Sequence, residues 1–99
     1  MRPGRDKRLA SLIKRLAAEF LGREIAGEFI LTVNRAALDA AGGRVKIYVT
    51  IFPDSAEAKG MSEARRLRRP LQLFIRSEIG LKTTPYLDIL LDNGAVAKW

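Results

Sequence analysis

The sequence of 99 residues contains no cysteine and no histidine. Their absence excludes disulfide bonds, thiol nucleophiles, imidazole acid–base catalysis and zinc sites built from these two residue types. It also fits a reducing cytoplasm, where we expect the protein to reside. No apolar run approaches the length of a membrane span, and no signal-peptide core follows the basic N-terminus, so we expect neither a membrane segment nor a secretory leader.

Motifs that carry catalysis are also scarce. There is no glycine-rich phosphate loop, and most carboxylates fall at expected helix caps, turns and exposed helix positions. Without histidine or cysteine, catalysis would need a carboxylate pair, a lysine or a metal held by oxygen atoms, and no spacing indicates one. We therefore expect a protein that is not an enzyme and has no cofactor. A nuclease with an oxygen-bound metal, resting on Asp88 or Asp92, is an alternative to be tested.

Positive charge is abundant. The chain has 18 lysines and arginines against 11 acidic residues, a net charge of +7 and a pI of about 10.4. On electrostatic grounds nucleic acid is the first partner to expect, with an acidic protein or an anionic membrane surface behind it. A basic surface that only confers solubility is the simplest alternative.

The charge is densest in residues 64–80, ARRLRRPLQLFIRSEIG, which include four arginines within five positions. Apolar residues recur there every three or four positions, the spacing of a helix with one face toward a core. On an ideal helical wheel Arg65, Arg69, Gln72 and Arg76 lie together, away from that stripe. Because neighbouring arginines repel one another, a purely structural role would not favour such a row, and we expect it to bind a polyanion.

Pro70 interrupts this helical pattern. It cannot donate a hydrogen bond to the carbonyl of Arg66, which costs about 3 kcal/mol inside a helix. Either one helix ends near Arg69 and another begins with Pro70 in its first turn, or a single helix kinks at Pro70. The apolar spacing continues across Pro70 without a phase jump, so we expect a kink or a tight junction rather than a long loop.

The remaining patterns predict one α+β domain over residues 1–99, in the order α-β-β-α-(kink)-α-β. The helices are expected on one face of a three-stranded sheet, whose open face includes Lys46 and Tyr48. Residues 1–5 are expected to form a flexible arm, and 95–99 a short tail. The predicted elements are a helix over 6–25, a strand from 29 to 34 or 38, a turn at 39–43, a strand over 44–51, a loose approach at 55–60 with a cap at Asp54 or Ser55, a firm helix from 62, and a strand over 86–91.

Several strings, in this order, are similar to those of the ribosome-binding factor A family, whose members assist assembly of the bacterial small ribosomal subunit. Together they span most of the chain. The matching residues are Arg2, Pro3, Arg8, Leu12, Ile13 and Glu19 near the start, then Arg23–Ile25, Leu31–Val33 followed by Val45–Thr50, Phe74–Ser77, and finally Pro85, Leu87, Asp92 and Asn93.

The resemblance implies a type II KH-like fold in which an interrupted helix replaces the usual GxxG loop. The family's Ala-x-Gly interruption is absent, and Pro70 stands in that zone. The implied function is binding of the 30S subunit and its 16S rRNA during late maturation, including 5′-end processing by other enzymes and growth in the cold. No enzymatic activity is implied.

We accordingly expect a cytoplasmic monomer that binds rRNA through phosphate contacts, with little base specificity. A module that docks an acidic protein partner, without enzymatic activity, is the alternative. The residues predicted to contact RNA are Arg65, Arg66, Arg68, Arg69 and Arg76, helped by Lys14, Arg15 and Lys46, with Pro70 as the helix kink.

Overall fold

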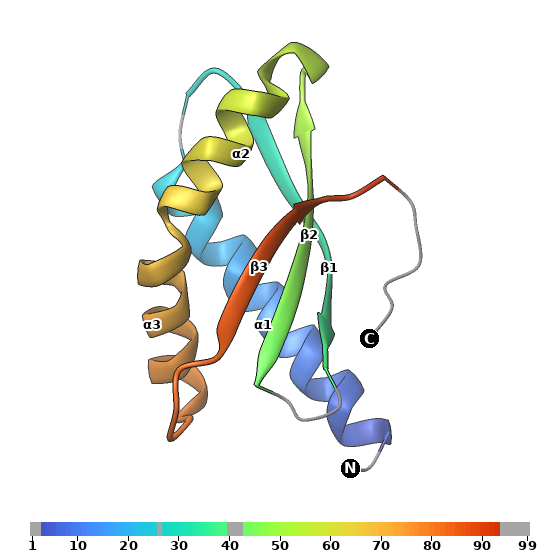
Figure 1. Cartoon of the computed structure of the whole chain (residues 1–99), viewed down its shortest axis with the longest axis vertical. Helices are drawn as coiled ribbons and strands as arrows, with labels where there is room; N and C mark the ends of the chain where they lie inside the picture. The colour runs from blue at the N-terminus through green and yellow to red at the C-terminus, as the bar shows by residue number, and fades with distance from the viewer. Residues whose placement is uncertain (1–2, 26, 40–42, 94–99) are drawn as a thin grey trace.

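The computed structural model describes residues 3–25, 27–39 and 43–93, and its elements follow the predicted order (Figure 1). Helix α1 begins at Pro3 and so includes residues 3–5 of the segment predicted as an arm, whose flexibility stays a prediction. The predicted tail at 95–99 lies outside the described residues. The helices are α1 (Pro3–Glu24), α2 (Glu57–Arg66) and α3 (Arg68–Ile79), with a short 3-10 turn, η1 (Asp54–Ala56), before α2.

The sheet is mixed and has three strands in the order β1-β2-β3. Strand β1 (Ile30–Leu38) pairs antiparallel with β2 (Arg44–Phe52), and β3 (Tyr86–Leu91) pairs parallel with β2. A parallel pair needs a long crossover connection, and the segment containing α2 and α3 provides it. The predicted α+β architecture is confirmed.

A bulge at Asn34 keeps the apolar side chains of β1 on one face. Val33 pairs with Val49, whereas Arg35, two residues later, pairs with Tyr48. The extra residue shifts the alternation by one position, so that Ala36 and the end of the strand again face the core.

Helix α1 crosses the sheet on one face and also packs against α3 (Figure 1). The alternating strand residues and the apolar helix stripes meet there in one core, as their spacing predicts. The opposite face of the sheet carries no helix among the described residues. The buried apolar residues are Ile13, Leu16, Ala17, Phe20 and Leu21 of α1, Val33 of β1, Val45, Ile47, Val49 and Ile51 of β2, Met61, Ala64, Leu67, Leu71 and Ile75 of the helical segment, and Leu87 and Ile89 of β3.

Residues 57–60 belong to α2, so the prediction of a loose approach to a helix starting at 62 is wrong. Gly60 is buried, and a Cβ added there would lie 2.5 Å from the Cδ1 atom of Ile51. The glycine therefore lies inside the helix, at a point where the helix closely approaches β2. Neither η1 nor α2 has a side-chain cap, so the predicted caps at Asp54 or Ser55 do not form.

Gly80 ends α3, with a φ of 80° and its N–H donated to the carbonyl of Arg76. Among the described residues, no helix has the length and apolar character that crossing a bilayer requires.

Candidate nucleic-acid interface

The break between α2 and α3 lies at Leu67, three residues before the predicted kink at Pro70. Leu67 has φ −89° and ψ 4°, and its N–H reaches the carbonyls of Glu63 and Ala64 at 3.3 and 3.1 Å. Pro70 is the third residue of α3, where a missing N–H costs little because first-turn N–H groups have no intrahelical acceptor. The structure thus has the tight junction of two helices, and the buried side chain of Leu67 anchors it.

Arg65 lies against the outer edge of β3. Its Nε and Nη2 atoms each donate to the carbonyl of Ile89 at 3.3 Å. Gln72, predicted to lie on the charged face with Arg65, is instead buried, and its Oε1 accepts the N–H of Leu87 at 3.3 Å. The helical wheel was wrong for Gln72 because β3 runs along these helices, and its outward-facing backbone groups need partners.

Arg76 lies at the other end of α3 and binds the loop to β3. Its guanidinium donates to the carbonyls of Leu81 and Lys82 at 3.4 and 3.2 Å and to the hydroxyl of Thr84 at 3.3 Å. Arg65 and Arg76 are exposed residues, yet the guanidinium groups of both hold the polypeptide together. Their predicted contact with RNA stays a prediction, and their first role in this fold is structural.

The three arginines nearest the junction are disposed differently. Arg66 pairs with Glu63 of the preceding turn at 2.9 Å. Arg68 reaches across to β3, where its Nη1 donates to the hydroxyl of Tyr86 at 3.2 Å. Arg69 is exposed and makes no hydrogen bond or ion pair with the part of the chain that the structure describes. Arg69 is therefore the most available of the three arginines nearest the junction.

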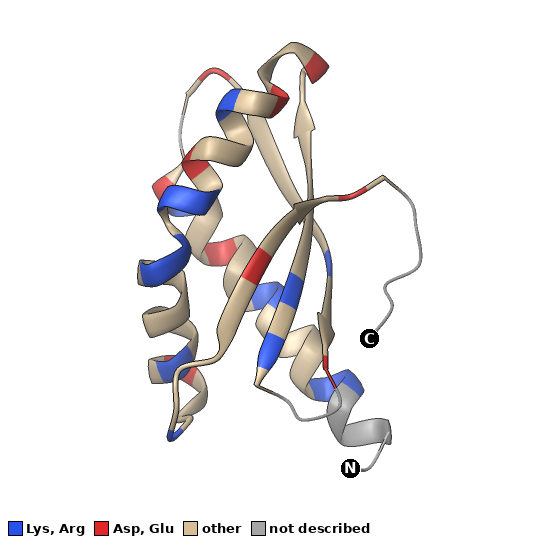
Figure 2. Cartoon of the chain, in the orientation of Figure 1, with Lys and Arg blue, Asp and Glu red and all other residues tan. Residues whose placement is uncertain are grey.

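Further cations lie on the open face of the sheet. Arg44 of β2 pairs with Asp88 at 3.4 Å, and its guanidinium lies 5.4 Å from the ring centroid of Tyr86. Lys46 follows two residues later on the same face, as predicted. Together with Arg68, these residues carry positive charge from the start of α3 across β3 to β2, and Figure 2 shows basic positions on both the helices and the middle strand.

Sequence reasoning missed Arg44 and Tyr86 as members of this surface. Both lie on the polar side of alternating strands, but strand order is needed to see that they are neighbours. The parallel register pairs Arg44 with Tyr86, and nothing in the alternation of either strand encodes that pairing.

Lys14 and Arg15 are exposed on α1, the helix that covers the other face of the sheet. An exposed side chain of that helix points away from the sheet, whereas Lys46 lies on the open face. The structure therefore does not bring all eight predicted residues onto one surface. Arg68 reaches Tyr86 at the edge of the open face that carries Lys46, whereas Lys14 and Arg15 lie on the side of α1 that points away from the sheet.

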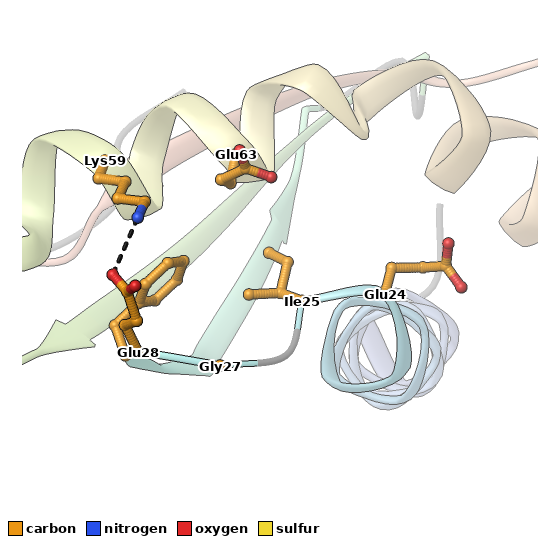
Figure 3. Close-up of a pocket in the computed structure, with 7 residues that line it drawn as sticks. Glu24, Ile25, Gly27, Glu28, Lys59 and Glu63 are labelled. Atoms are coloured by element: carbon orange, nitrogen blue, oxygen red, sulfur yellow. Dashed lines mark hydrogen bonds and ion pairs between the residues drawn. The ribbon is translucent and has the colours of Figure 1, made fainter.

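A pocket of about 310 Å³ lies at the far end of α2, between that helix and the segment joining α1 to β1 (Figure 3). Its charged lining residues are Glu24, Glu28, Glu63 and Lys59, a net negative set that disfavours phosphate. Lys59 donates to Glu28 at 3.0 Å. This contact lowers the pKa of Glu28 and raises that of Lys59, in each case through the hydrogen bond first and the opposite charge second.

The described residues hold no group of three or more acidic side chains close enough to bind a metal ion. The Asp88 and Asp92 carboxylates, on which a metal nuclease would rest, pair instead with Arg44 and Arg35, each at 3.4 Å.

No model of a protein family matches the chain, and no curated protein matches it. Several solved structures, however, are similar to it. Ribosome-binding factor A from Thermus thermophilus superposes with a TM-score of 0.77 at 23% identity, over 87% of this chain and 94% of that one. A Thermotoga maritima protein provisionally assigned as a ribosome-binding factor A superposes with a TM-score of 0.80 at 23% identity, over 100% of this chain and 98% of that one.

A third similar structure is the Thermus thermophilus factor as fitted into the cryo-electron microscopy map of a complex with the 30S subunit. Its TM-score is 0.68 at 22% identity, over 88% of this chain and 94% of that one. The matches extend through the interrupted helix and the mixed sheet, so the resemblance seen in the sequence holds for the fold. The chain has the fold of ribosome-binding factor A.

Proposed function

We propose that the protein is a ribosome-binding factor of the ribosome-binding factor A family, acting in the cytoplasm on the 30S subunit and its 16S rRNA. The observation that carries the proposal is the superposition over the full chain at a TM-score of 0.80. The sequence strings in matching order support it, because fold alone does not determine function. A similar structure fitted into a map of a 30S complex supports the choice of partner.

The proposed activity is binding without catalysis. The factor binds during late maturation and assists 5′-end processing that other enzymes carry out, with its effect greatest in the cold. Phosphate contacts by Arg66, Arg68 and Arg69, together with Lys46 on the open face of the sheet, supply the affinity. Such contacts position a protein on RNA without reading its bases. Arg65 and Arg76 add to the positive electrostatic potential that attracts the RNA, while they also hold β3 and the loop before it.

The test is co-sedimentation of the purified protein, expected to be a monomer, with isolated ribosomal subunits over a range of salt concentrations. Binding to 30S should weaken steeply as salt rises, because each phosphate contact releases counterions. Arg69→Glu should weaken binding and reduce the slope of log affinity against log salt by about 1. Lys7→Glu, an equal charge change at an exposed residue of α1 outside the predicted set, should leave that slope unchanged.

Depletion in cells provides the second arm. Accumulation of free small subunits containing 16S rRNA with immature 5′ ends is the expected phenotype, and a normal gradient profile would contradict the proposal. Binding to a protein partner with no affinity for 30S or its rRNA would instead favour the module that docks an acidic protein.

A further inference from the structure

Tyr86 is an exposed aromatic ring held between two arginines. It is the first residue of β3, with 42% of its surface exposed. The guanidinium carbons of Arg44 and Arg68 lie 5.4 and 5.3 Å from its ring centroid, and Arg68 also donates to its hydroxyl. Residues of β2, β3 and α3 therefore fix the position of a ring that is still open to solvent.

Tyr48, the other tyrosine on this face, is in a different state. It is half-buried, and the guanidinium of Arg35 lies only 4.3 Å from its ring centroid. Asp92 holds that guanidinium in place through a contact at 3.4 Å. The guanidinium over Tyr48 lies closer to its ring than either arginine lies to Tyr86, and Tyr48 is less exposed, so Tyr86 is the more accessible tyrosine for a further planar group.

The charges around Tyr86 select the ligand. Arg44 and Arg68 flank the ring, Arg69 follows on α3, and Asp88 is the acidic side chain paired with Arg44. An aromatic face beside guanidinium groups is complementary to a planar base carried on a phosphate backbone. Bases in a duplex are stacked on one another and do not present their faces, so the complementary ligand is unpaired RNA.

We propose that Tyr86 is a stacking site for an unpaired RNA base, with Arg44 and Arg68 binding the adjacent phosphates. This inference rests on the proposed function and adds the class of RNA that the surface takes. The contacts of the two arginines with the ring are weak at an exposed site, so an incoming base replaces or extends them at little cost.

The test uses an unpaired oligoribonucleotide of about eight nucleotides, within the usual site size for such surfaces. One base is replaced by fluorescent 2-aminopurine. Binding is followed by anisotropy, stacking by quenching, and the same strand annealed to its complement serves as the duplex. Tyr86→Leu should weaken binding of the unpaired strand at least about fivefold and abolish the quenching, as loss of one base–aromatic stack predicts.

Tyr86→Phe keeps the ring and loses only the hydroxyl contact with Arg68, so its affinity and quenching should stay close to wild type. Tyr48→Leu removes the less accessible ring and is the matched control, again with affinity close to wild type. Thermal melts of all three variants establish that they are folded. Unchanged binding by Tyr86→Leu, equal binding of duplex and unpaired strand, or no binding of the unpaired strand would each overturn the stacking site.

These outcomes are separable from the test of the proposed function. If Tyr86→Leu binds the oligoribonucleotide as wild type does, while 30S binding still responds to salt and to Arg69→Glu, the stacking site alone is wrong. If the wild-type protein does not bind 30S at all, the proposed function is wrong, whatever Tyr86 does.

Discussion

At the scale of single residues, Gly60 is a position where the core leaves no room for a side chain. A Cβ at this position would lie 2.5, 3.0 and 3.1 Å from the Cδ1, Cγ2 and Cγ1 atoms of Ile51. Gly60→Ala should therefore lower the free energy of unfolding by about 1–3 kcal/mol, as overpacking of a core does. Urea denaturation measures this, and Ile51→Val, which removes the nearest atom, should recover part of the loss.

Gly22 is the matched control for that prediction. It lies inside α1, and nothing lies within 4 Å of a Cβ added there. Gly22→Ala should stabilise the protein by up to about 1 kcal/mol, the gain in helix propensity. If Gly60→Ala stabilised the protein as Gly22→Ala does, the close approach of α2 to β2 would be wrong.

The Glu28–Lys59 ion pair predicts a pH dependence. Because the pKa of Glu28 is lowered, the contribution of the pair to stability is present above the pKa of an unfolded glutamate and is lost as pH falls through the folded value. Because the pKa of Lys59 is raised, the same contribution is lost as pH rises through the folded pKa of the lysine.

Lys59→Gln should return the pKa of Glu28 upward to its ordinary value, since both causes of its depression come from Lys59. An NMR titration of the Glu28 carboxyl carbon measures this. Lys82→Gln, at an exposed lysine in the loop before β3, should leave the titration unchanged. A Glu28 pKa that is insensitive to Lys59→Gln would contradict the ion pair.

At the scale of elements, the helix junction assigns Pro70 a smaller role than the sequence suggested. Since the break lies at Leu67 and Pro70 occupies the first turn of α3, Pro70→Ala should leave the break in place. We expect a loss of about 0.4–1 kcal/mol in unfolding free energy, because the unfolded chain gains freedom. Backbone chemical shifts of residues 66–71 and urea denaturation measure the two effects. Helical shifts running unbroken through Leu67 would show that the proline makes the break.

The elements also show what a sequence can predict. The alternation from Val45 to Ile51 gave β2 and its two faces, because period-two burial is a local property. The bulge at Asn34 and the burial of Gln72 were not predictable, since each depends on a partner strand whose register is set by tertiary pairing. The loose approach predicted at 55–60 was wrong because glycine in a helical pattern indicates either a break or a close approach, and only the position of Ile51 shows which of the two applies to Gly60.

The same limit applies to the candidate interface. Local composition located the arginines of residues 65–76, but it could not show that Arg65 and Arg76 hold β3 and the loop before it. It also could not show that Arg44 and Arg68, from elements far apart in sequence, meet at Tyr86. The charge was therefore predicted correctly, and the surface that presents it was not.

For the whole molecule, the net charge of +7 predicts a response to salt in the absence of any ligand. Added salt screens the repulsion among 18 basic residues as the Debye length falls from about 30 Å at 0.01 M to about 10 Å at 0.1 M. The surface ion pairs that salt also weakens are each worth little. The melting temperature should therefore rise over this range of sodium chloride, by calorimetry or circular dichroism, and a fall would mean that the ion pairs outweigh the repulsion.

The contacts of Arg65 and Gln72 with β3 affect the tendency of this protein to aggregate. An outer strand with unsatisfied backbone groups is a template on which other chains can add strands, and such addition leads to aggregates. At this edge the guanidinium of Arg65 already donates to the carbonyl of Ile89, and the side-chain oxygen of Gln72 accepts the N–H of Leu87. The two side chains therefore block the addition of another strand at this edge. A variant lacking both should aggregate at protein concentrations at which the intact protein does not.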